Sequence, residues 1–189
     1  GSVGYYQTVN KTTPVAGDVK YVDRNGDGVV DDNDRDIIGN PNPDFTYGFQ
    51  TKVSWKSLSL SASFNGVQGR DILNVGNRYN NTPGTKSNNV TRKAFQNMWT
   101  DENPSNLYPK STFVVQNMVM DRYVEDGSYL RCSDITLSYI LPAKWTNKIG
   151  IKNTSVYASV KNAFVITDYS GYDPEVNSFA FDGLRPGVD

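Results

Sequence analysis

An acidic stretch between residues 23 and 34 carries the side chains in this sequence that are best suited to chemistry. Oxygen-bearing side chains fall at positions 1, 3, 5, 9 and 12 of the stretch, and glycine stands at position 6. Calcium loops of the helix-loop-helix type use these positions, together with a backbone carbonyl at position 7. The spacing therefore predicts a Ca²⁺ site. Its expected ligands are Asp23, Asn25, Asp27, Val29, Asp31 and Asp34.

Two features distinguish this stretch from the usual calcium loop. Position 12 is Asp34 rather than glutamate, and the shorter side chain reaches a cation with one oxygen only. The preceding residues 18–22 are strand-like, so the incoming helix is absent. An alternative stays open, because Asp, Asn and Gly also favour a turn held by side-chain to backbone hydrogen bonds without a metal. Crowded among polar residues, these carboxylates do not resemble a general acid, which needs an apolar setting.

The composition excludes most enzyme chemistry. The 189 residues include no histidine and one cysteine, which rules out Ser-His-Asp and Cys-His triads and a thiolate zinc site. The formal charge is 19 − 20 = −1, whereas a nucleic-acid surface needs a basic excess. Hydrophobic residues are 37% and aromatic residues 12%. This balance favours β structure with a large polar surface.

Strict alternation of apolar and polar residues predicts antiparallel strands. One strand begins at Phe45 and ends at Trp55, and a second follows the two-residue turn Lys56-Ser57, giving a hairpin over residues 45–65. Two more strands are expected in residues 128–167, separated by a short helical turn over residues 142–149. The strands have the roughly ten-residue length of membrane-crossing β-strands.

Long polar segments separate these strands. Residues 17–44 form the acidic loop, residues 66–127 are rich in Asn, Gly, Ser and Thr, and residues 168–189 are rich in Gly, Pro, Asp and Tyr. Within the longest segment, residues 91–99 predict a short helix. The residues expected on one face of this helix are Ala94, Phe95, Met98 and Trp99.

Two architectures fit the alternation. One is a soluble antiparallel sheet with one face on a core. The other is part of a barrel whose apolar face meets lipid and whose polar face lines a wet lumen. The connections run short, very long, short and long again, which is the order typical of outer-membrane barrels.

Several short motifs, in their order and spacing, extend over nearly the whole chain. They are Gly17 to Asp23, Asn25 to Gly28, Ile38 to Pro43, Trp99 to Pro104, Glu125 to Arg131, Leu141-Pro142, Asn162 to Phe164 and Thr167 to Glu175. With these motifs the chain resembles the C-terminal part of the SusC/RagA family of TonB-dependent outer-membrane transporters. The fold class that we expect is mainly β, with antiparallel strands and long loops from a transporter barrel that this chain alone does not close.

The resemblance implies a barrel of about 22 strands with an N-terminal plug. It implies import of oligosaccharides, or of peptides in some members, powered by TonB-ExbB-ExbD through an N-terminal region that this chain lacks. It further implies a SusD-like surface lipoprotein as lid, contact with membrane lipid, a location in the outer membrane, and no nucleic-acid partner.

The resemblance also orients the loops. If the turns at residues 56–57 and 142–153 are periplasmic, the segments 17–44, 66–127 and 168–189 are external. A calcium site there would stiffen an external loop. Aromatic side chains in these segments are candidates for stacking on a ligand, with ordinary loop packing as the alternative. They are Tyr79, Trp99, Tyr169 and Tyr172.

Three functions are thus compared. The first is a non-enzymatic transporter segment, and the second is a soluble calcium-dependent glycan-binding β module. The third is a hydrolase with a carboxylate pair, but no spacing singles out such a pair. We therefore expect no catalytic residues and favour the transporter.

Overall fold

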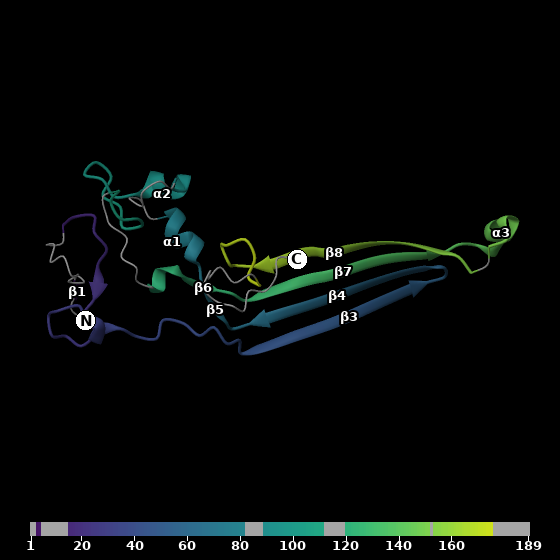
Figure 1. Ribbon diagram of the computed structural model, residues 1–189, viewed down its shortest axis with the longest axis horizontal. Coiled ribbons are helices and arrows are strands. Elements are labelled where there is room, and N and C mark those ends of the chain that lie inside the picture. Colours follow the sequence, from purple (N-terminus) through teal and green to yellow (C-terminus); the bar gives the residue numbers. More distant parts are fainter. Residues whose placement is uncertain (1–2, 5–14, 82–88, 112–119, 152, 176–189) are drawn as a thin grey trace. The chain divides into compact units, whose positions relative to one another are not determined.

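The computed structural model describes residues 3–4, 15–81, 89–111, 120–151 and 153–175 (Figure 1). The chain divides into two compact units. The first contains residues 1–39, 73–124 and 176–189, and the second contains residues 40–72 and 125–175. Within the described ranges, every helix is too short or too polar to cross a membrane.

A four-stranded antiparallel sheet dominates the second unit (Figure 1). Its order is β3 (Phe45–Trp55), β4 (Leu58–Gln68), β7 (Tyr129–Ile140) and β8 (Ser155–Thr167). The strands have 11 to 13 residues. All three strand pairs are antiparallel and paired over nearly their full lengths. The alternation in the sequence thus corresponds to a long, regular sheet.

Short connections join the strands at one end of this sheet. Lys56 takes a left-handed conformation with φ 54° in the turn between β3 and β4. Between β7 and β8 the chain forms α3 (Ala143–Thr146) and the 3-10 turn η3 (Asn147–Ile149). Gly150 ends this turn with φ 74°, a conformation that costs glycine little. The sequence places Pro142 in the first turn of this helix, whereas in the structure Pro142 is the N-cap residue and α3 begins at Ala143.

The register gives the sheet two different faces. Side chains that face each other across strands lie on the same side, so paired residues of like polarity define each face. The apolar face contains Phe49, Val53, Trp55, Leu60, Ala62, Phe64, Ile135, Leu137, Val156, Val160 and Phe164. The polar face contains Gln50, Lys52, Ser61, Ser63, Asn65, Arg131, Asp134, Thr136, Ser159 and Lys161.

A β-bulge at Ser133 interrupts this pattern. Opposite Ser63 and Phe64, β7 contributes Asp134 and Cys132, so Ser133 is the extra residue. Its hydroxyl donates to the carbonyl of Ser63 at 3.2 Å. Because side chains alternate with a period of two, one extra residue exchanges the faces of the residues beyond it. Arg131 therefore lies on the polar face, opposite Asn65.

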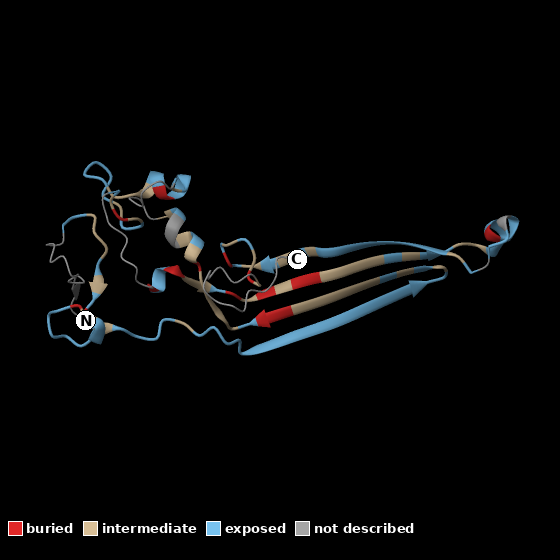
Figure 2. Ribbon diagram, viewed as in Figure 1, coloured by how far each residue is buried: buried red, intermediate tan, exposed pale blue. Residues whose placement is uncertain are grey.

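Within the four-stranded sheet, the buried residues gather at the end of β4 and the start of β7 (Figure 2). They include Val67, Tyr129, Arg131 and Cys132. By contrast, β3 is exposed along its whole length. β4 also continues to Gln68, three residues beyond the predicted strand, because Gly66 leaves room for the Tyr47 ring and the Tyr129 carbonyl.

The first unit is built from short elements. They are β1 (Val3–Gly4), β2 (Tyr21–Val22), η1 (Asp32–Asp34), α1 (Val75–Asn81), α2 (Arg92–Asn97) and η2 (Asp121–Tyr123). Strands β1 and β2 pair with each other. The short strands β5 (Asp71–Leu73) and β6 (Val124–Asp126) also pair, and most of their residues belong to the second unit. Among the described residues of the first unit, the buried hydrophobic side chains are those of Val30, Ala94, Met120 and Tyr123.

The helix expected over residues 91–99 is shorter in the structure. Thr91 caps α2 by accepting from the backbone N–H of Ala94, and the helix ends at Asn97. Met98 is extended and forms a bridge with Tyr108. Ala94 is fully buried whereas Phe95 is 67% exposed. The single apolar face that the sequence predicts is therefore wrong, since a helix of fewer than two turns buries only one narrow side.

Gly66 offers a test of the sheet packing. A Cβ at this position would collide with the Tyr47 ring and lie 2.7 Å from the Tyr129 carbonyl oxygen. In the intact receptor that contains this chain, we expect Gly66→Ala to lower the free energy of unfolding by about 1 to 3 kcal/mol. Urea unfolding followed by tryptophan fluorescence measures this change. Gly48→Ala is the matched control, because its Cβ meets only the Phe64 carbonyl at 3.4 Å. Equal losses of stability from the two substitutions would contradict the close packing of Gly66 against Tyr47 and Tyr129.

Candidate functional site

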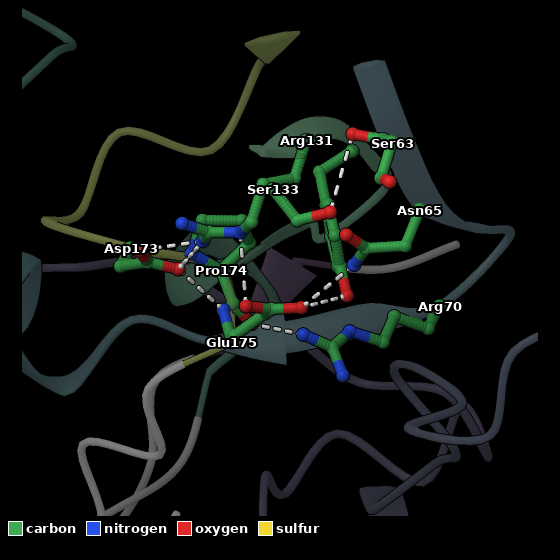
Figure 3. A network of polar contacts seen from close by, with 9 residues as sticks. Ser63, Asn65, Arg70, Arg131, Ser133, Asp173, Pro174 and Glu175 are labelled. Carbon is green, nitrogen blue, oxygen red and sulfur yellow. Dashed lines mark hydrogen bonds and ion pairs between the residues drawn. The ribbon is translucent and has the colours of Figure 1, made fainter. Parts of the chain in front are cut away.

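A polar network joins distant parts of the chain on the polar face of the sheet (Figure 3). Asn65 comes from β4, and Tyr129 and Arg131 come from β7. Arg70 follows β4 by two residues. These four side chains form a group that we call the cradle. Their partners belong to the exit segment, residues 168–175, which follows β8.

Arg131 is the centre of the cradle. Its Nη2 lies 2.7 and 2.6 Å from the two carboxylate oxygens of Asp173, and its Nε lies 2.9 Å from Glu175 Oε2. The side chain is only 11% exposed. A guanidinium so far removed from water needs charged partners, since an uncompensated buried charge costs several kcal/mol. The two carboxylates supply this compensation.

The other cradle residues surround the same carboxylates. The Tyr129 hydroxyl donates to Glu175 Oε1, and Asn65 Nδ2 donates to the same oxygen at 3.3 Å. Arg70 donates from Nη2 to the carbonyl of Pro174. The guanidinium carbons of Arg70 and Arg131 lie 5.8 and 5.9 Å from the Tyr129 ring centroid. Two cations thus flank one aromatic ring, a favourable arrangement because the ring face is electron-rich.

The exit segment is also fixed at its start. Ser170 donates through its backbone N–H and its hydroxyl to the Glu125 carboxylate, at 2.8 and 2.9 Å. Tyr169 is buried over Gly171, where a Cβ would collide with the ring. Pro174 is buried as well. Tyr172, between these anchors, is fully exposed. The segment is therefore held at both ends and presents Tyr172 to solvent.

The charge of Arg131 changes the acidity of its partner. Partial burial raises the pKa of Asp173, but the hydrogen bonds from Arg131 and from the Glu175 backbone N–H, with the positive charge of Arg131, outweigh burial. The net result is a pKa of Asp173 below its ordinary value. Asp173 is therefore ionised throughout the neutral range and keeps its ion pair there.

The acidic loop is held by its own backbone. Asp23 is 2% exposed, and its carboxylate accepts from the N–H groups of Gly26 and Gly28 at 2.6 and 2.9 Å. Asp34 accepts from the N–H groups of Arg24 and Asp31, both at 2.7 Å. The bond from Asp31 is the main reason why the pKa of Asp34 lies below its ordinary value. Both ends of the stretch are thereby tied together.

The remaining predicted calcium ligands make local turns. Asn25, Asp27 and Asp31 each accept from the N–H two residues ahead, at 3.0, 2.8 and 2.7 Å. Within the described ranges, no three carboxylate, thiol or imidazole side chains lie close enough to hold a metal ion. The residue types suit Ca²⁺. In this structure, however, their side-chain oxygens accept hydrogen bonds from backbone N–H groups of the same loop. Calcium binding therefore stays a prediction.

The predicted ligand-binding aromatics lie in both units. Tyr169 and Tyr172 belong to the exit segment of the second unit. Trp99, in the first unit, is half-buried over Gly17, where a Cβ would lie 2.6 Å from the indole. Tyr79 is in α1, and its side chain lies outside the described part of the structure. Among the predicted aromatics whose side chains the structure describes, Tyr172 is fully exposed, whereas Tyr169 is buried and Trp99 is half-buried.

The cradle and its carboxylates were not predicted as a site. Arg131 reads in the sequence as an ordinary strand residue, and its partners lie 42 and 44 residues further along the chain. The sequence nonetheless contains a signal that could have located this site. Two of the motifs that carry the family resemblance, residues 125–131 and 167–175, contain Tyr129 and Arg131 on one side and Asp173 to Glu175 on the other.

The lowered pKa of Asp173 predicts how the exit segment responds to acid. A carboxyl group whose pKa is lower in the folded state stabilises that state above its unfolded value of about 3.9, and this contribution is lost as the pH falls through the folded value. We expect hydrogen exchange at the Glu175 amide, corrected for intrinsic rates, to stay slow from pH 7 to 5 and to accelerate below about pH 4. In Asp173→Asn it should be faster already at pH 7. Loss of protection between pH 7 and 5 in the wild type would contradict the assignment.

Comparison with known proteins identifies the family. No family model matches the chain. It is 34% identical over 175 residues to TonB-dependent receptor P26 of Formosa agariphila, covering 90% of this chain and 17% of that receptor. It is also 34% identical over 165 residues to TonB-dependent receptor SusC of Bacteroides thetaiotaomicron, covering 84% of this chain and 15% of SusC. The chain thus spans about one sixth of the length of these relatives.

Solved structures agree with the sequence matches. A structure of the RagAB peptide transporter superposes with a TM-score of 0.64 at 30% identity, covering 73% of this chain and 15% of that chain. The RagAB peptide importer in the open-open state gives a TM-score of 0.67 at 30% identity, covering 82% and 18%. The antiparallel sheet described above is therefore a part of such a barrel, left unclosed by this chain. The chain belongs to the SusC/RagA family of TonB-dependent receptors.

Proposed function

We propose that the chain forms part of the barrel wall of an outer-membrane receptor that imports oligosaccharides or peptides. TonB-dependent receptors are transport proteins and not enzymes, in agreement with the predicted lack of catalytic residues. The observation that carries the proposal is the exposed apolar face of the sheet. The other face is polar, as expected for a wall between lipid and a wet lumen.

The apolar face extends over all four strands. Val53 is 64% exposed, Leu60 46%, Leu137 45% and Val160 56%, although each sits in a regular strand. On β3 and β4, Phe49 and Phe64 stack with ring centroids 4.6 Å apart. Soluble proteins rarely expose contiguous apolar patches of more than a few hundred Å². Contact with membrane lipid removes this cost.

The alternative, a soluble calcium-dependent glycan-binding module, is less favourable. Such a module would cover the apolar face with a second layer of its own. In the described part of the chain, the strand residues of this face remain largely open. Trp55, at the turn end of β3, is 69% exposed. An aromatic residue at this position fits the girdle where a barrel meets the membrane surface.

We infer the partners from the family. A SusD-like surface lipoprotein would close the barrel from outside, and TonB-ExbB-ExbD would supply energy through the N-terminal region of the full receptor. The related structures are described as a peptide importer, and a relative is SusC, which leaves oligosaccharides and peptides as the substrate classes. The exposed Tyr172 supports a role of the exit segment in capturing such a ligand.

We further propose that the acidic loop binds Ca²⁺. Support comes from the residue types and their spacing and from the ionised state of Asp34. The backbone bonds of the loop leave lone pairs on the carboxylates, and a cation would draw these oxygens inward. An extracellular site of this kind functions with a weak dissociation constant of about 10⁻⁴ to 10⁻³ M.

Transport is tested in cells. A strain that lacks the intact receptor is complemented with the wild type, Leu60→Arg or Ser61→Arg, and TonB-dependent uptake of labelled oligosaccharides and peptides is measured. Arg on the lipid face costs about 2 to 4 kcal/mol at the bilayer midplane, so Leu60→Arg should reduce the receptor in the outer membrane. Ser61→Arg, on the polar face one residue away, should leave its amount unchanged. A receptor that is water-soluble without detergent, or unchanged uptake of both substrate classes on deletion, would refute the proposal.

Calcium binding is tested by stability. At 10 mM Ca²⁺ the proposed affinity stabilises the site by about 1.4 to 2.7 kcal/mol relative to chelator, by mass action. Hydrogen exchange of residues 23–34 in the intact receptor should slow accordingly. Asp27→Asn with Asp31→Asn removes two charges but keeps a hydrogen-bond acceptor at each position, and should abolish the response. Asp101→Asn, in an exposed loop, is the control. If hydrogen exchange in the wild type does not respond to Ca²⁺, the proposal is wrong and the stretch is a turn held by side-chain to backbone hydrogen bonds alone.

A further inference from the structure

The cradle is built on a rigid part of the molecule, independently of the segment that it binds. Asn65 pairs with Arg131, and Val67 pairs with Tyr129, in the backbone register of β4 and β7. Arg70 is fixed by its carbonyl, which accepts from the Gly127 N–H at 2.8 Å. The backbone of the cradle residues is therefore placed by strand pairing and by the Arg70–Gly127 bond, without the exit segment.

The exit segment contributes to the cradle in the manner of a bound ligand. Asp173, Pro174 and Glu175 offer a carboxylate, a carbonyl and a second carboxylate, and cradle side chains contact all three. The Glu175 N–H donates to Asp173 Oδ1 at 2.8 Å, which keeps both carboxylates on one side. Figure 3 shows the two carboxylates turned toward Arg131.

Among the described residues, the carboxylates in contact with the cradle are those of this ligand. Arg70 and Arg131 contribute two positive charges, and Asp173 and Glu175 two negative charges. Other carboxylates nearby have different partners, since Glu125 accepts from Ser170, and Asp134, on the same face, accepts from Thr136 at 2.8 Å. If the exit segment leaves, Arg131 loses both of its carboxylate partners and Arg70 loses the Pro174 carbonyl, so the vacated site presents two cations that an external anion can pair with.

We propose that the cradle is a binding site for acidic peptides with two carboxylates spaced as in Asp-Pro-Glu, and that residues 173–175 are its built-in ligand. An external acidic peptide binds when these residues leave. The fork of Arg131, the Tyr129 hydroxyl and the Asn65 amide recognise the carboxylates, and Arg70 recognises the backbone carbonyl between them. Whether the site faces the lumen rests on the proposed function, whereas its ligand chemistry does not.

Tethering explains why the built-in ligand normally fills the site. A segment attached by a short linker has an effective concentration of the order of millimolar, so a free peptide of equal intrinsic affinity competes poorly. Substitutions that weaken only the ligand residues should unmask the cradle. Asp173→Asn with Glu175→Gln, the release variant, removes both charges with little change in shape.

The experiment measures binding of a fluorescent, terminally blocked Asp-Pro-Glu peptide to the intact receptor by anisotropy. We expect the release variant to bind it at least about tenfold more tightly than the wild type, because the competing ligand is weakened. Adding Arg131→Gln to the release variant should remove this gain. Asp32→Asn, which breaks the exposed ion pair with Arg35, should bind as the wild type does.

Three results would overturn the proposal. They are no gain in the release variant, equal binding of a matched Asn-Pro-Gln peptide, and a gain that survives the loss of Arg131. Should Arg131→Gln prevent folding, judged by the heat-modified gel mobility of the barrel, Arg131→Lys replaces it. Lysine keeps the charge but loses the bidentate fork, so the gain should become smaller. Neither readout depends on transport, so a failure here is separate from a failure of the proposed function.

Discussion

The two-residue repeat of an extended strand is the constraint on which the rest of the structure depends. It assigns each side chain of β3, β4, β7 and β8 to one face, and the antiparallel register then brings like residues together across the strands. One face becomes mainly apolar and the other mainly polar. The low hydrophobic content of the chain follows from this arrangement, because a wall between lipid and water needs apolar residues on one side only.

The bulge at Ser133 connects this constraint to the candidate site. Counted along β7 without interruption, Arg131 would share a face with Ile135 and Leu137 and would be directed into the apolar side. The extra residue reverses the alternation, so the guanidinium meets Asn65 and the carboxylates of the exit segment instead. A local irregularity of one residue thus decides whether this charge is compensated.

The sequence predicts the regular part of the fold well and the site poorly. Alternation locates β3, the Lys56-Ser57 turn, and most of β7 and β8, because each strand carries its own pattern. It ends β4 too early, since Gly66 reads as a break when it is a position of close packing. The contacts of Arg131 leave no local trace, as its partners lie more than forty residues away. The acidic loop shows the opposite case, in which spacing alone suggests a metal while the structure shows backbone bonds.

The long insertion between β4 and β7 has a consequence for the order of assembly. The hairpin of β3 and β4 closes a two-residue turn, whereas pairing β4 with β7 closes a loop of about 60 residues and costs about 3 kcal/mol more in chain entropy. The β7–β8 pair, joined through α3, is also local. Entropy therefore favours two hairpins that form early and dock late. The cradle lies across the pairing of the two hairpins, with Asn65 on one and Arg131 on the other, so it is completed only when they dock.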